Sequence, residues 1–290
     1  MHICRFNHDR LGLVEGDLVF DITPALESLP SPTWPYQPGD PLIALLDQLR
    51  LAATRLRPKA PSYALEEVSL HSLVTAPSKI MAAPANYRLH VEKDVQDPGL
   101  HHGFHNVQLT SLERPVETLG LFLKANSSLV GPADGIPLYW RDRRNDHEVE
   151  LAVVIGRRGK NIPATEAFEY IAGYTIGLDM SVRGTEDRSF RKSADGYTVL
   201  GPWLTTADAI ADPERLDIWL EVNGERRQQS STAALTVGIA RMIELASNAY
   251  TLYPGDVLLT GTPEGVSQVN PGDSLRAGGE GIGEFTIQVR

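Results

Sequence analysis

The sequence predicts an α+β protein that is mainly β: a mixed β-sandwich roll preceded by a small N-terminal α/β module. Two observations lead to this fold class. Short apolar or alternating segments, separated by Gly and Pro turns, recur through most of the chain, whereas few segments have helical periodicity. We place the α/β module at residues 1–75 and the mostly β unit at residues 76–290.

The first unit contains one predicted hairpin and one predicted helix. Residues 12–22, GLVEGDLVFDI, alternate apolar and polar residues on both sides of a Gly-Asp pair, which predicts a hairpin. Residues 40–56, DPLIALLDQLRLAATRL, repeat apolar residues at helical spacing and so predict a helix.

The second unit has three further signals. In residues 216–229, Leu, Ile, Leu and Val alternate with Asp217, Trp219 and Glu221, and the chain then reaches Asn223-Gly224, which predicts a hairpin. Residues 236–250 place apolar side chains on one helical stripe. Residues 163–174, PATEAFEYIAGY, predict a shorter helix with Phe168, Ile171 and Ala172 facing inward.

Residues 146–156, DHEVELAVVIG, read as a strand that begins with charged residues and ends in the core. Side chains two apart share a face, so Glu148 and Glu150 point the same way. The apolar run beyond them implies burial on both faces of the strand. Asp179 ends another apolar segment. Two carboxylates near a core repel each other unless a shared proton, a basic partner or a cation relieves them.

Spacing alone leaves two interpretations of these acids open. A Glu-x-Glu pair on a strand is most often the solvated polar face of an antiparallel sheet. The alternative is an oxygen-ligand site formed by Glu148, Glu150 and Asp179, for which Mg²⁺ or Mn²⁺ is more suitable than Ca²⁺ or Zn²⁺.

Composition restricts the partners. The formal net charge of −10 argues against nucleic acid or an anionic membrane surface, so we expect a small-molecule ligand. No apolar run reaches the ~20 residues that span a bilayer, and the first residues lack a secretory pattern, so we expect a cytoplasmic protein. The single cysteine, Cys4, excludes an internal disulfide and a cysteine-based metal site.

Four motifs resemble the fumarylacetoacetate hydrolase (FAH) family in order and in spacing: NDHEVELAVVIG, GYTIGLDMSVRG, FRKSADGYTVLGPWLTT and LTGTPEGV. Upstream of them, PANYRLHVEK resembles the family's NY…H segment, and the resemblance spans roughly residues 76–290. The resemblance implies the family's mixed β-sandwich roll, a homodimer, and Mg²⁺ or Mn²⁺ bound by Glu148, Glu150 and Asp179.

The resemblance also implies a set of pocket residues. A fixed cation at Lys192 could stabilise an enolate or bind a carboxylate, although the SADG that follows also suits a surface lysine. Thr262 lies in the turn GTPEG, where the turn alone explains the Gly and Pro residues, so a role for the Thr262 hydroxyl comes mainly from the resemblance. The expected substrate-binding residues are Tyr87, Lys124, Arg183, Lys192 and Thr262.

His90 is the expected catalytic base. In hydrolytic family members a histidine pairs with a glutamate three residues later and activates water, but here that position is Lys93. On a helix a step of four returns nearly to the starting face, so Asp94 is the better partner by geometry, with Glu92 as the alternative. This departure puts strictly hydrolytic chemistry in question.

Three histidines in HHGFH, at positions 101, 102 and 105, suggest zinc. No regular periodicity follows them, and we expect a loop over the pocket mouth instead.

The sequence therefore predicts a divalent-metal-dependent hydrolase. Its reaction would cleave a carbon–carbon bond in a 1,3-dicarbonyl or 2-oxo acid, for example an acylpyruvate, through a metal-stabilised enolate and histidine-activated water. The alternatives are an oxaloacetate-type decarboxylase, a hydratase or dehydratase of a sugar-derived 2-oxo acid, and a non-catalytic, metal-dependent oxo-acid binder.

Overall fold

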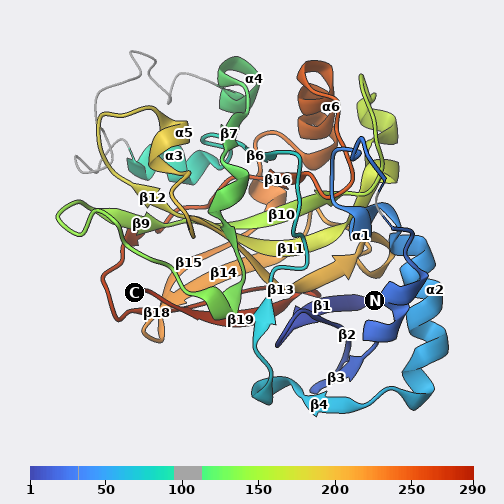
Figure 1. The fold of residues 1–290 in the computed structure, drawn as a ribbon. Helices are drawn as coiled ribbons and strands as arrows, with labels where there is room; N and C mark the ends of the chain where they lie inside the picture. Colours follow the sequence, from blue (N-terminus) through green and yellow to red (C-terminus); the bar gives the residue numbers. More distant parts are fainter. Residues whose placement is uncertain (32, 95–112) are drawn as a thin grey trace.

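The computed structural model describes residues 1–31, 33–94 and 113–290 (Figure 1). Within these residues, twelve strands join into one large mixed sheet. They are β1 (His2–Phe6), β2 (Arg10–Glu15), β3 (Leu18–Asp21), β4 (Ser62–Ala64), β5 (Leu70–His71), β6 (Ile80–Ala82), β7 (Phe122–Lys124), β8 (Leu129–Val130), β10 (Val149–Ile155), β11 (Ile171–Asp179), β13 (Thr198–Thr206) and β16 (Val257–Leu259). Their order is β4-β3-β2-β1-β13-β11-β10-β16-β6-β7, with β5 beside β1 and β8 beside β13.

Two smaller sheets complete the β structure. One has the order β12-β9-β17, formed by β9 (Asn145–His147), β12 (Ser181–Val182) and β17 (Ser267–Gln268). The other has the order β15-β14-β18-β19, formed by β14 (Asp217–Val222), β15 (Glu225–Ser231), β18 (Ser274–Gly279) and β19 (Gly283–Gln288).

Helices are few and short in the described part of the chain, which confirms the predicted mainly β class. The α-helices are α1 (Pro41–Ala44), α2 (Leu46–Leu56), α3 (Arg88–Asp94), α4 (Pro115–Leu119), α5 (Arg188–Arg191) and α6 (Ile239–Ala249). Short 3-10 helices span Thr23–Ser28, Arg57–Lys59, Leu65–Glu67, Asn126–Ser128, Pro132–Asp134, Ala164–Tyr170, Ala207–Ala209 and Thr232–Ala234. None of the helices described is long and apolar enough to cross a membrane.

Four predicted elements are confirmed. The hairpin at 12–22 is β2–β3, and the hairpin at 216–229 is β14–β15 with Asn223 and Gly224 at positive φ. The stripe at 236–250 is the buried face of α6. The helix at 40–56 is α1 and α2, and Asp40 caps α1 by accepting bonds from the Leu42 and Ile43 amides.

The predicted helix at 163–174 is wrong in its second half. Residues Ala164–Tyr170 form a 3-10 helix in which Phe168 is 44% exposed, and β11 begins at Ile171. The strand prevails because β11 is hydrogen-bonded to β10 on one side and β13 on the other, so its backbone groups are satisfied in the centre of the sheet.

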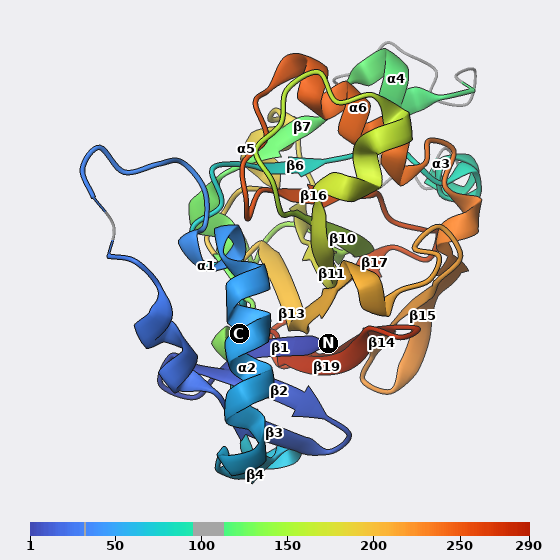
Figure 2. The ribbon, with the colours of Figure 1, turned by 90° about the vertical axis from the view of Figure 1, so that its right-hand side faces the viewer.

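The core lies on both faces of the central strands. Along β10, Val149, Leu151 and Val153 pack into the larger apolar cluster, and Ala152 and Val154 pack into a second one. Helix α2 contributes to this second cluster and lies across the N-terminal strands (Figure 2). This double burial explains the continuous apolar sequence of β10.

The N-terminal strands continue the large sheet. Strand β1 pairs antiparallel with β13, with His2 opposite Thr205 and Ile3 opposite Leu204. The boundary near residue 75 stays a prediction, because this sheet runs through both units.

Candidate metal centre and substrate pocket

The sheet brings the three predicted acidic residues together. Glu150 lies in β10, Glu148 directly precedes that strand, and Asp179 is the last residue of the neighbouring β11. The Asp179 amide donates to the Glu148 carbonyl at 2.9 Å. Carboxylate oxygens of the three residues lie within 4.8 Å of one another, and the residues are only 6%, 1% and 1% exposed. The acids are therefore not a solvated sheet face.

Two buried lysines contact this cluster. Lys192 Nζ lies 2.8 Å from Glu148 Oε2 and 2.8 Å from Asp179 Oδ2. Lys124 Nζ contacts Asp179 Oδ1 and donates to the Tyr197 carbonyl at 2.7 Å. Burial lowers the pKa of Lys124, against the opposing effect of Asp179. The lysines leave one carboxylate, Glu150, without a cation in direct contact among the residues described.

The electrostatic environment separates the two glutamates. Burial raises the pKa of Glu150 well above its usual range, and the carboxylates of Asp179 and Glu148 raise it further. Burial acts in the same direction on Glu148, but Lys192 and Arg183 outweigh it and hold the pKa of Glu148 well below its usual range. The three buried carboxylates repel one another, and their oxygen atoms are suitable ligands for a hard divalent cation such as Mg²⁺ or Mn²⁺.

Arg183 lies at the rim of the cluster and is itself held by acids. Its Nε donates to Asp146 Oδ2 at 2.7 Å, and its Nη2 donates to Glu148 Oε1 at 3.2 Å. Ser181 Oγ donates to the same Glu148 oxygen at 2.8 Å. Sequence reasoning missed Ser181, although alternation from Asp179 through 181 to 183 could have identified it.

A pocket of about 90 Å³ opens onto the carboxylates. His90, from α3, lies in its wall and is buried. Burial lowers the pKa of His90 to about 4, although Glu148 acts in the opposite direction, so the imidazole is neutral at pH 7 and able to accept a proton. The lining residues are Ala83, Pro84, Ala85, His90, Phe122, Glu148, Glu150, Asp179, Arg183, Arg188, Lys192 and Thr262.

The candidate partners of His90 are Glu92 and Asp94. Glu92 is exposed, whereas His90 is buried, so the two side chains differ in environment along α3. The side chain of Asp94 lies outside the described part, as do His101, His102 and His105. The proposed pairing of His90 with Glu92 or Asp94 therefore stays a prediction.

The other predicted substrate residues differ in access. Thr262 lines the pocket, but its hydroxyl donates to the Val149 carbonyl at 2.9 Å and accepts from Gln228 at 2.8 Å. Lys124 is fully buried behind Asp179. Tyr87 is 1% exposed, and its hydroxyl has no hydrogen-bond partner among the residues described. Neither Lys124 nor Tyr87 is among the lining residues.

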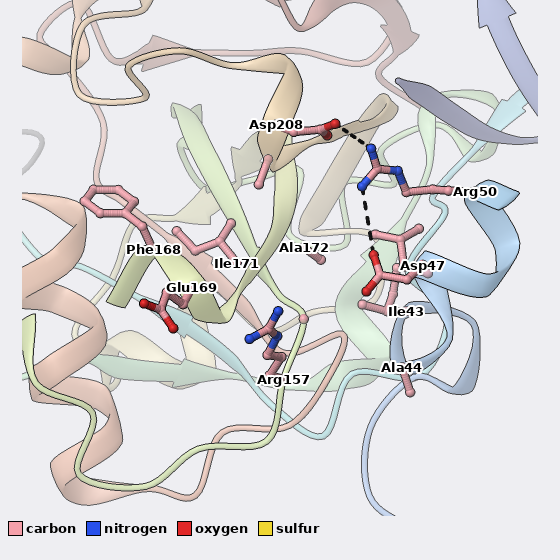
Figure 3. A pocket seen from close by; sticks show the side chains of 13 residues that line it. Ile43, Ala44, Asp47, Arg50, Arg157, Phe168, Glu169, Ile171, Ala172 and Asp208 are labelled. Carbon is pink, nitrogen blue, oxygen red and sulfur yellow. Dashed lines mark hydrogen bonds and ion pairs between the residues drawn. The ribbon is translucent and has the colours of Figure 1, made fainter. Parts of the chain in front are cut away.

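A larger cleft of about 440 Å³ lies elsewhere, between the α1–α2 segment and the start of β11 (Figure 3). Arg50 spans one side of it, forming ion pairs with Asp47 and Asp208. In the described part of the chain, the acids with metal-ligand spacing are in the smaller pocket and not in this cleft. We therefore assign the candidate site to the smaller pocket.

Comparison with known proteins agrees with this fold and site. The family described as fumarylacetoacetate (FAA) hydrolase C-terminal matches residues 79–290, so the chain belongs to the fumarylacetoacetate hydrolase family. The maleylpyruvate hydrolase of Aquipseudomonas alcaligenes is 51% identical over 290 residues, which cover 100% of this chain and 99% of the relative.

Two further relatives are informative. A crystal structure of maleylpyruvate hydrolase from Sphingobium sp. SYK-6, in complex with manganese(II) ion and pyruvate, matches with a TM-score of 0.81 and 37% identity, covering 100% of this chain and 98% of that one. The mitochondrial oxaloacetate tautomerase of Rattus norvegicus is 38% identical over 223 residues, covering 75% of this chain and 66% of the relative.

Proposed function

We propose that the protein is a divalent-metal-dependent hydrolase that cleaves the carbon–carbon bond of an acylpyruvate, with maleylpyruvate as the first substrate to test. One observation carries the proposal: a buried cluster of three carboxylates shares a pocket with the buried imidazole of His90. The full-length similarity to a maleylpyruvate hydrolase supports the same reaction.

Glu148, Glu150 and Asp179 would hold Mg²⁺ or Mn²⁺. When bound, the ion supplies Lewis-acid polarisation of the substrate carbonyls and stabilises negative charge on oxygen. Manganese in the Sphingobium relative supports this assignment.

The side chains around the cluster have distinct roles in this proposal. Lys192 and Arg183 bind the carboxylate of the pyruvoyl end, because both present charged N–H groups at the pocket wall. His90 takes a proton from water, whose hydroxyl adds to the distal carbonyl carbon. The adjacent carbon–carbon bond then breaks. The released methylene carbon takes a proton, which gives pyruvate, and the acyl carbon leaves as a carboxylic acid.

Decarboxylation of oxaloacetate is the second candidate. It needs enolate stabilisation but no water-activating pair, and Lys93 occupies the position where hydrolytic members of the family have glutamate. The rat relative, an oxaloacetate tautomerase, supports testing this substrate.

The two candidates are separated by one assay series. The purified chain is stripped of metal with a chelator, resupplied with Mg²⁺ or Mn²⁺, and assayed on maleylpyruvate and on oxaloacetate. We expect metal-dependent cleavage of maleylpyruvate that falls at least 100-fold in Glu148→Gln and in His90→Asn, whereas exposed Glu66→Gln retains it. Metal-dependent turnover of oxaloacetate alone would favour the decarboxylase, and turnover that is independent of metal would contradict the site assignment.

The quaternary structure and the location belong to the same proposal. We expect a homodimer in the cytoplasm, as the family resemblance and the sequence predict. Light scattering coupled to gel filtration measures the first directly, and a monomeric mass would contradict it.

A further inference from the structure

The cations that line the pocket differ in whether an acid of the protein already contacts them. Lys192 contacts Glu148 and Asp179, and Arg183 contacts Asp146 and Glu148. Both of these groups neutralise acids of the protein itself. A substrate carboxylate therefore has to share them with the cluster.

Arg188 also lines the pocket, but its situation is different. Within residues 1–31, 33–94 and 113–290 its guanidinium makes no hydrogen bond and no ion pair. Instead, its guanidinium carbon lies 5.3 Å from the centroid of the Phe122 ring. A cation–π contact of this kind uses no N–H group of the guanidinium as a hydrogen-bond donor to an acceptor atom, so these donors stay available. Leaving such donors without an acceptor in a partly buried pocket is unfavourable, and a ligand anion would correct it.

Arg188 lies close to Lys192, which contacts the carboxylate cluster. The Lys192 amide donates to the Arg188 carbonyl at 3.1 Å, so Lys192, the residue that follows α5, lies one helical turn after Arg188. One turn separates their Cα atoms by about 6 Å along the axis. Both cations lie near the same ring, with Lys192 Nζ 5.8 Å and the Arg188 guanidinium carbon 5.3 Å from the Phe122 centroid. Lys192 contacts Glu148 and Asp179, whereas no ion pair joins Arg188 to either acid among the residues described.

We propose that Arg188 binds a second carboxylate at the distal, acyl end of the substrate, so that the pocket selects acylpyruvates that carry two carboxylates. This inference rests on the proposed acylpyruvate hydrolase function. A planar guanidinium forms two parallel bonds to a carboxylate, which gives both affinity and orientation. An acyl group that ends in a methyl group would leave these donors without a partner and would be bound less well.

The test compares two substrates in Arg188→Gln. The acyl group of maleylpyruvate ends in a carboxylate, whereas acetylpyruvate has a methyl group in place of the whole carboxyvinyl group. We expect kcat/KM for maleylpyruvate to fall about 10–100-fold, mainly through KM, because a charge-assisted pair is lost. For acetylpyruvate, kcat/KM should stay within about twofold of the wild-type value. Arg188→Lys keeps the charge but not the paired geometry and should give an intermediate result.

Product inhibition gives a second readout. Maleate, the dicarboxylate product, should inhibit Arg188→Gln at least about tenfold more weakly, whereas inhibition by pyruvate should be unchanged. Arg215→Gln is the matched control, because that arginine is 80% exposed. Circular dichroism establishes that each variant is folded.

The outcomes separate this inference from the proposed function. An equal fall for both substrates would overturn it and make Arg188 a structural residue, and unchanged kinetics with unchanged maleate inhibition would overturn it as well. If the wild-type protein cleaves neither acylpyruvate, the proposed function fails. Thermal-shift titration with maleate and with acetate then still tests the role of Arg188. Maleate should raise the Tm of the wild type more than acetate does, and this difference should be lost in Arg188→Gln.

Discussion

At the scale of single residues, Glu150 is the least compensated member of the carboxylate cluster. Its described direct contact is with the Gly261 amide, which donates to Oε2 at 2.6 Å. Lys192 bridges the other two acids instead. Burial and the neighbouring carboxylates raise the pKa of Glu150, so without a cation the folded protein favours its protonated form. Glu150 is therefore the carboxylate that a bound cation would stabilise most, and without a cation its charge destabilises the folded protein.

We predict that Glu150→Gln stabilises the metal-free protein by about 1–3 kcal/mol near pH 8. A folded pKa above the unfolded value means that the folded state binds more protons. The stability contribution of Glu150 is therefore fully present below the unfolded value, near 4.5, and is lost as pH rises toward the raised folded value. The difference in free energy of unfolding between wild type and variant should grow over this range.

Urea unfolding of both proteins from pH 5 to pH 8, in the presence of a chelator, measures this difference. Added Mn²⁺ should raise the Tm of the wild type and leave that of the variant almost unchanged. A variant that is less stable than the wild type at pH 8 would contradict the assigned repulsion.

At the scale of elements, α5 carries Arg188 and is followed by Lys192, although it has only four residues. Asp187 caps its start by accepting a bond from the Ser189 amide at 2.8 Å. We predict that Asp187→Ala lowers stability by about 1 kcal/mol and raises KM for acylpyruvates, because a frayed α5 no longer holds these cations in place. Thermal unfolding and steady-state kinetics measure the two effects. Asp195→Ala, also at an exposed acid near α5, should change neither.

The elements also show how far sequence reasoning reaches. The acids could be found because β10 and β11 alternate regularly and are apolar beyond the charges, so spacing defines the face. The sequence predicts a longer helix than the 3-10 helix at Ala164–Tyr170, since a local pattern does not reveal the pairing of Ile171 with Ile155 of β10. Arg188 was missed for a similar reason. Several other arginines lie close to Arg188 in the sequence, and only the three-dimensional structure shows which of them form ion pairs with acidic residues.

At the scale of the whole molecule, the first 75 residues cover part of the core. The second apolar cluster combines Leu49 and Ile3 from this segment with Ala152, Val154 and Leu259 from the remainder of the chain. We predict that residues 76–290 alone do not fold cooperatively, because removing the segment exposes this apolar face and the open edge of β13. Circular dichroism melting and dye binding measure this. A sharp unfolding transition for the truncated chain would instead support the boundary near residue 75.

The placement of the carboxylates on the sheet and of Arg188 on a short helix has a consequence for how substrate range can change. The acids are held by pairing between β10 and β11, which also builds the core. Arg188 lies outside this pairing, so under its proposed role a replacement there would alter which acyl group fits and leave the ligand geometry in place. Divergence among relatives, and redesign in the laboratory, can therefore exchange the substrate while retaining the same bond-breaking chemistry.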